Sequence, residues 1–306
     1  MILFTRLRNF CMPYLFGFLV LACAIVLPHG ANSSTQDVAG IPAEDLQAAS
    51  EQFALAEYGE IIYRKNPHAP QQVYIIGQSH RSALTGQGGP DLVKVQAEIY
   101  RIGEWLILEN NVEMLLPEGF FQKTAKGKVS SMETARETMR LDNQTLKDRL
   151  SDPIRFVNAD LLLKANYNIP FGQVENEQLY RDISRLLHQA RQEKDFSVLS
   201  ELNLLQDERT AVMLQNIPDI VEEAYRTGQI GNRKAMFTIG LAHIGAIINN
   251  LQRGSLRGSA QPDPTDGEAS ELSLKLLDQG YGVTVIIPRT LAENQRTLRL
   301  AGLKTD

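Results

Sequence analysis

Two histidines occur in the same short pattern at widely separated places in the chain. His80 follows Val73-Tyr-Ile-Ile-Gly-Gln-Ser, and His243 follows Met236-Phe-Thr-Ile-Gly-Leu-Ala, so each comes three residues after a glycine that ends an apolar run. A neutral imidazole can bind a metal ion or accept a proton at physiological pH. The repeated pattern therefore raises the hypothesis that both histidines serve one site.

Charged side chains follow three further apolar runs, namely Glu118 after residues 112–116, Glu175 after residues 169–174 and Arg289 after residues 283–287. In open parallel sheets, ligands bind outside the carboxyl ends of the strands, so we expect these groups to meet the two histidines at one edge. Each residue alone also has a structural explanation, because a glutamate early in a helix interacts favourably with the helix dipole. The set as a whole favours a functional site.

Two chemistries suit two histidines and two glutamates. In the first, His80, His243 and Glu118 bind a divalent ion such as Mn²⁺, Co²⁺ or Zn²⁺ and leave a position for water. Such an ion lowers the pKa of its water and polarises a carbonyl group. In the second, one histidine is a general base oriented by a glutamate, while the other histidine or Arg289 stabilises an oxyanion. The chain has no Gly-x-Ser-x-Gly sequence, which argues against a serine hydrolase.

The elements that must position these residues alternate along the chain. Apolar runs predict strands at residues 73–76, 112–116, 169–174, 235–239 and 283–287. Apolar spacing predicts helices at residues 92–107, 132–150, 177–191, 197–225 (with Pro218 as a kink or break), 244–251 and 272–277. This alternation predicts an α/β fold with a mostly parallel sheet flanked by helices. We expect a single domain over residues 71–306, preceded by a lead-in helix and linker over residues 34–70.

Composition narrows the possible functions. The chain of 306 residues is 43% hydrophobic with a formal net charge of −5, which gives no sign of nucleic-acid binding. Both cysteines, Cys11 and Cys23, precede the predicted domain, so that domain contains no disulfide, no thiol nucleophile and no cysteine-based zinc site.

The N-terminal segment has the features of an export signal. Arg6 and Arg8 precede an apolar run over residues 10–27, and small polar residues follow, as in a secretory signal peptide over residues 1–33. Two alternatives remain: lipidation at Cys23, which ends a lipobox-like Leu-Val-Leu-Ala-Cys, and an uncleaved membrane anchor of nearly the ~20 residues needed to span a bilayer. All three place the domain outside the cytoplasm, in the periplasm or the extracellular space.

Several short motifs together resemble those of the Tiki/TraB proteins, which share a superfamily with erythromycin esterases and haem-binding ChaN lipoproteins. In chain order they are Gly77-Gln-Ser-His80, Pro117-Glu118-Gly119, Gly172-Gln-Val-Glu175, the helix Asp207–Met213 and Gly240-Leu-Ala-His243-Ile-Gly245. The resemblance implies an α/β domain of related halves and a metal-dependent peptidase. It implies that His80, Glu118 and His243 are metal ligands or catalytic groups, that Glu175 belongs to the same motif set, and that Arg209 points into the site from the helical layer.

The sequence therefore predicts an exported metal-dependent hydrolase that acts on peptide or ester bonds. Gln78 departs from the family, whose members often have Glu or Thr there, and a glutamine neither acts as a base nor readily binds a hard cation. That departure favours the alternative, a haem- or small-ligand-binding protein of the ChaN type without catalysis. In that case Tyr74 or Tyr281 is a candidate haem ligand.

Overall fold

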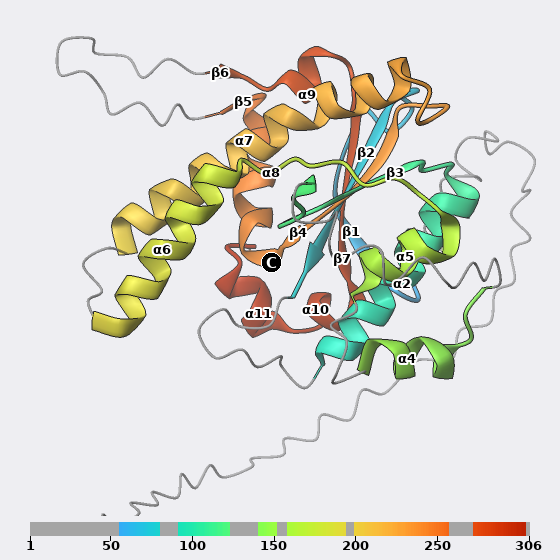
Figure 1. Ribbon diagram of the computed structural model, residues 1–306, viewed down its shortest axis with the longest axis horizontal. Coiled ribbons are helices and arrows are strands. Elements are labelled where there is room, and N and C mark those ends of the chain that lie inside the picture. Colours follow the sequence, from blue (N-terminus) through green and yellow to red (C-terminus); the bar gives the residue numbers. More distant parts are fainter. Residues whose placement is uncertain are drawn as a thin grey trace, which may run out of the picture.

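The computed structural model describes residues 55–79, 91–122, 140–151, 158–193, 199–256 and 272–303. These residues form three layers, with helices packed on both faces of one central sheet (Figure 1). The predicted α/β class, a mostly parallel sheet flanked by helices, is confirmed.

The central sheet has the strand order β1-β7-β2-β4-β3. Its strands are β1 (Gly59–Lys65), β2 (Gln72–Gln78), β3 (Met114–Pro117), β4 (Lys234–Gly240) and β7 (Gly282–Pro288). The last four run parallel, and β1 pairs antiparallel with β7 at one edge. All residues of β3 and β7 are buried, as expected for parallel strands that are covered on both faces. The four parallel strands coincide with predicted strands.

The helices fall into three groups around the sheet (Figure 1). On one face lie α2 (Leu92–Glu109), α4 (Asn143–Ser151) and α5 (Ala159–Tyr167). On the other lie α6 (Glu177–Glu193), α7 (Leu199–Arg226), α8 (Ile244–Arg253) and α9 (Lys275–Asp278). At the carboxyl edge are the short 3₁₀ helix η2 (Leu241–His243), α10 (Arg289–Ala292) and α11 (Gln295–Leu300). A separate ladder joins β5 (Ser255–Leu256) to β6 (Leu272–Ser273).

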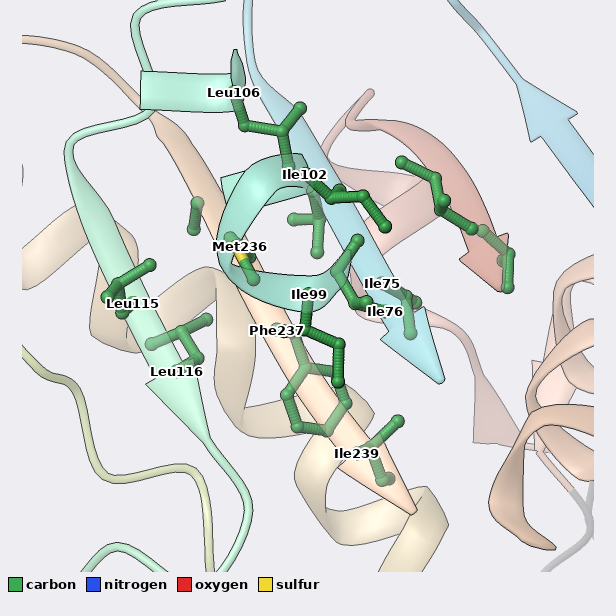
Figure 2. Packing of buried hydrophobic residues seen from close by; sticks show 14 of the residues in the cluster. Ile75, Ile76, Ile99, Ile102, Leu106, Leu115, Leu116, Met236, Phe237 and Ile239 are labelled. Atoms are coloured by element: carbon green, nitrogen blue, oxygen red, sulfur yellow. The ribbon is translucent and has the colours of Figure 1, made fainter. Parts of the chain in front are cut away.

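The core is built from the apolar stripe of α2 against the sheet. Figure 2 shows Ile99, Ile102 and Leu106 of this helix above the buried side chains of β2, β3 and β4. Gly103 lies in the same stripe, where an added Cβ would be 2.3 Å from the side chain of Leu163 in α5. The glycine therefore lets the two helices approach closely. Full burial of each isoleucine or leucine stabilises the fold by roughly 1.5–3 kcal/mol, which holds the strand ends at fixed positions.

Two sequence predictions about local structure were wrong. Residues 169–174, predicted as a strand, make only a single bridge, from Phe171 to Leu115 beside β3, because Pro170 has no N–H with which to extend the pairing. Residues 272–277, predicted as helical, divide instead between β6 and α9. There the hydroxyl of Ser273 donates to Asp278, and its carbonyl accepts from Gln215 of α7.

Pro218 does not end α7, which runs unbroken from Leu199 to Arg226. The helix continues through the proline because Leu214, Ile217 and Val221 around it are all buried, and their packing offsets the loss of one backbone hydrogen bond.

The structure also contains elements that were not predicted. Strand β1 lies within the expected lead-in, and helix α5 occupies residues for which the sequence pattern predicts no element. The expected helix over residues 132–150 is described only in its last part, as α4. None of the described helices is long and apolar enough to cross a membrane, and the predicted signal or anchor, with Cys23, lies outside the described residues.

Candidate functional site

The two strands that carry the repeated glycine pattern are neighbours in the sheet. Gln78 at the end of β2 lies opposite Gly240 at the end of β4, and Pro117 at the end of β3 lies opposite Thr238. Strand pairing thus places three strand ends side by side. His243, in η2, follows β4 directly and is largely buried. His80, the other histidine of the pair, lies outside the described residues.

Arg209 of α7 joins the two predicted glutamates into a buried Glu–Arg–Glu cluster. Its Nη2 donates to Oε1 of Glu118 over 2.7 Å and also to Oε1 of Glu175, while its Nε donates to Oε2 of Glu175 over 3.0 Å. Backbone N–H groups complete the cluster, with Gly240 donating to Glu118 Oε2 over 2.5 Å and Gly119 to Glu175 Oε1 over 3.2 Å. The cluster therefore connects α7 to the carboxyl ends of β3 and β4.

This cluster has a formal charge of −1 in a largely dry environment. The side chains of Glu118, Arg209 and Glu175 are 9%, 7% and 0% exposed. Burial alone would lower the pKa of Arg209, but hydrogen bonds and charges from Glu175 and Glu118 outweigh it and raise that pKa above its ordinary value. The guanidinium consequently stays charged wherever the protein is folded.

The hydrogen bonds of His243 define its tautomer. Its Nδ1 lies 2.7 Å from the hydroxyl oxygen of Thr210, and that hydroxyl donates its proton to the carbonyl of Gln206 over 2.7 Å. A hydroxyl has one proton, and we assign it to the bond with Gln206, so that Thr210 accepts from His243. The Nδ1 atom therefore carries a hydrogen, and in the neutral ring Nε2 is the basic nitrogen. That nitrogen lies on the side of Glu118.

The distance between His243 and Glu118 suits a shared divalent ion. Nε2 of His243 lies 3.7 Å from Oε1 of Glu118. Zinc binds nitrogen and oxygen at about 2.0–2.2 Å, so two ligands of one tetrahedral ion lie roughly 3.4 Å apart. The observed separation is thus about 0.3 Å above this value, and Oε1 of Glu118 also accepts from Arg209. Among the described residues, no cluster of three metal-binding side chains occurs. His80 lies outside those residues.

A cavity of about 600 Å³ opens over these residues at the carboxyl edge of the sheet. Its polar end is formed by Gln78, Ser79, Glu118, Arg209 and His243. Its apolar wall comes from α6, η2 and the segment around α11. This volume lies in the usual range for small-molecule sites, roughly 300–1,000 Å³.

The structure brings together four of the five predicted catalytic residues: Glu118, Glu175, Arg209 and His243. Arg289 does not join them, because it donates to the carbonyl of Ala56 and pairs with Glu293 at 3.6 Å. It belongs instead to the anchoring of α10.

The two tyrosines named as candidate haem ligands also lie elsewhere. The hydroxyl of Tyr74 donates to Asn110 over 3.4 Å at the opposite edge of the sheet. Tyr281 is 1% exposed just before β7, and burial raises its pKa to about 12. Among the described residues, Tyr180 of α6 is the tyrosine that lines the cavity at the carboxyl edge.

Sequence reasoning missed Thr210, Gln206 and Tyr180. Thr210 follows Arg209 directly, but helical spacing cannot show which of its faces meets a histidine 33 residues away in the chain. The amphipathic pattern of α6 was a usable signal for Tyr180, since it predicted a helix with one apolar face.

Comparison of the chain with protein families, with curated proteins and with solved structures found no match. The site is therefore interpreted from its own geometry.

Proposed function

We propose that the protein is an exported, metal-dependent hydrolase of peptide or ester bonds, with its site at the carboxyl edge of the sheet. One observation carries the proposal. The Thr210 hydroxyl directs the basic nitrogen of His243 toward Glu118, at a separation of 3.7 Å that a divalent ion can bridge. His243, Glu118 and, by the sequence pattern, His80 are the proposed ligands.

When bound, the ion would lower the pKa of a water molecule and polarise the carbonyl of the substrate. The residues of the chain prepare this site. Arg209 and the N–H of Gly240 orient the carboxylate of Glu118, and Thr210 orients His243. Glu175 has no exposed side-chain surface and accepts hydrogen bonds from Arg209, so we assign it a positioning role.

A second candidate is the binding of an apolar ligand such as haem without catalysis. The apolar wall of the cavity favours it, and Tyr180 places a phenol ring on that wall. Titration with haem tests this candidate, because ligation gives a Soret band that Tyr180→Phe should shift or abolish.

The proposed hydrolase is tested with the purified full chain, prepared without chelators. Bound metal is measured by elemental analysis, and hydrolysis of a peptide pool and of an acetate ester is followed with Mn²⁺, Co²⁺ or Zn²⁺. We expect His243→Gln to lower metal occupancy and to reduce hydrolysis by about 100-fold or more, since loss of a positioned catalytic group costs roughly 10²–10⁴-fold.

His188→Gln is the matched control, because His188 is an exposed residue of α6 that does not line the cavity. It should leave metal content and hydrolysis unchanged. A wild-type protein that binds none of the three ions, and is not stabilised by them, would rule the proposal out.

A further inference from the structure

One face of α6 forms a continuous wall of the cavity. Tyr180, Ile183, Ser184 and Leu187 all line it, and their spacing of three, one and three residues places them on one side of a helix. Leu241 of η2 and Ala301 after α11 add further apolar surface to the cavity. The wall is therefore uncharged and mostly apolar over about two helical turns.

The charged residues of α6 occupy other positions of the helix. Arg181 pairs with Glu177 one turn earlier, and Arg185 lies 3.0 Å from Asp182. None of these four residues lines the cavity. Among the described lining residues, the ionisable groups are Glu118, Arg209, His243 and the phenol of Tyr180, so formal charge is concentrated at the polar end.

Aromatic contacts hold the wall in place beside the charged cluster. The ring of Tyr180 packs edge-on against Phe121 with centroids 5.1 Å apart, and the guanidinium of Arg209 lies 5.3 Å from the same ring. The apolar wall thus begins directly at the site that holds Glu118 and His243.

From this division we infer that the cavity is a specificity pocket for a bulky, uncharged apolar group next to the reacting bond. A leucine or phenylalanine side chain of a peptide fits this description. A lysine or aspartate side chain on this wall would lose hydration without gaining a free partner, because the ionised residues of the cavity, Glu118 and Arg209, already pair with each other. The bound molecule is a substrate only if the proposed hydrolase is correct, but the binding preference itself needs no catalysis.

The preference is measured on the full chain in the presence of EDTA, by NMR titration with N-acetyl-leucinamide, N-acetyl-glycinamide and N-acetyl-lysinamide. Burial of a leucine side chain predicts that the leucine compound binds roughly tenfold or more tightly than the glycine compound. The lysine compound should bind no more tightly than the glycine compound.

Two neighbouring substitutions on α6 localise the effect. Leu187→Gln should reduce the leucine preference to about threefold or less because it places an amide on the wall. His188→Gln, on the exposed side, should leave it unchanged. Equal affinity for all three compounds, or a full preference retained in Leu187→Gln, would overturn the inference.

The ligand series on the unaltered chain needs no substitution, so a poorly folding variant does not remove the test. A leucine preference without hydrolysis under any metal would contradict the proposed hydrolase and leave the pocket standing. Hydrolysis without a side-chain preference would contradict the specificity pocket and leave the proposed hydrolase standing.

Discussion

Two buried ion clusters in this protein have opposite compositions. One is the Glu118–Arg209–Glu175 cluster at the carboxyl edge of the sheet, with a formal charge of −1. The other, on α2, consists of buried Arg101 and Glu104 with the largely exposed Arg140 and has a formal charge of +1. In each cluster, one charged side chain lies between two side chains of the opposite charge.

Every partner of the second cluster is structural. Glu104 accepts from Arg101 over 2.8 Å, from Arg140 over 3.0 Å and from the hydroxyl of Tyr167 over 2.6 Å. Arg101 also donates to the carbonyl of Leu141. The cluster therefore ties α2 to α5 and to the start of α4, and none of its residues lines the 600 Å³ cavity.

The first cluster differs by its position. It lies at the strand ends, beside His243 and under the cavity. A buried ion cluster therefore does not by itself identify a site, because similar bonds serve only to hold helices elsewhere in the fold. What distinguishes the first cluster is that one carboxylate, Glu118, meets both the cluster and the cavity.

The largest expected effect is on the free energy of unfolding, and it differs between the two clusters. Arg209→Met leaves two buried carboxylates without their cation, and breaking such a cluster costs about 3–5 kcal/mol. Glu104→Gln should cost less, about 1–3 kcal/mol, because Arg140 is 70% exposed and buried Arg101 keeps its bonds to Leu141 and Asn143. Urea unfolding at pH 7 measures both free energies.

Arg185→Met is the matched control for the arginine substitution, since its side chain is 75% exposed, and it should change the free energy of unfolding by about 0.5 kcal/mol or less. Equal losses in Arg209→Met and Glu104→Gln would remove the distinction between the clusters.

A second prediction concerns how the cluster on α2 affects the free energy of unfolding at alkaline pH. Burial and the bond to Glu104 raise the pKa of Tyr167 above its ordinary value. A group whose pKa is higher in the folded state contributes stability below the unfolded pKa, near 10, and that contribution is lost as the pH rises through the folded value. Tyr167→Phe should therefore cost roughly 1.5–3 kcal/mol at pH 8, from the lost bond to a charged acceptor, and show a smaller further loss at pH 11 than the unaltered chain.

The free energy of unfolding at the two pH values decides this prediction. Tyr281→Phe provides the comparison, because Tyr281, whose pKa is raised to about 12 by burial, is influenced by Glu222 and Arg233 rather than by either cluster and loses its contribution between pH 10 and 12. An unchanged pH dependence in Tyr167→Phe would show that the Arg101–Glu104–Arg140 cluster does not control alkaline stability.

The smallest expected effect concerns Thr210. Thr210→Val keeps the shape of the side chain but removes the acceptor for the Nδ1 hydrogen of His243, so the imidazole can adopt the other tautomer. We expect a loss of roughly tenfold in hydrolysis, equivalent to ~1.4 kcal/mol, with little change in folding stability. Nitrogen NMR of the His243 ring and the pH profile of hydrolysis report the change.

Thr210→Ser keeps the hydroxyl and should restore both readouts. A ring that keeps its hydrogen on Nδ1 in Thr210→Val would show that another part of the structure determines the tautomer.

Much of the fold could be predicted because its parallel strands are continuous apolar runs. Strands β2, β3, β4 and β7 are covered on both faces, so their burial is visible in the sequence. Strand β1 was missed because it is an edge strand with the mixed sequence Gly-Glu-Ile-Ile-Tyr-Arg-Lys and partial exposure. Its pairing depends on β7, which lies more than 200 residues later in the chain.

Part of the site could be predicted by the rule that strand ends converge. That rule brought Glu118 and His243 to one edge, and the family resemblance added Arg209. Glu175 joined them although residues 169–174 make only a single bridge beside β3. The same rule failed for Arg289, because the start of α10 turns that side chain toward Ala56.

By itself, the sequence determined the α/β class, the apolar strands and the polar residues that follow them, since these depend on local burial patterns. The tertiary structure decided which strands are neighbours, that Arg209 lies between two glutamates, and that Thr210 bonds Nδ1 of His243. These contacts join residues 33 to 91 positions apart, and their geometry follows from how α7 packs beside the strand ends rather than from any local pattern.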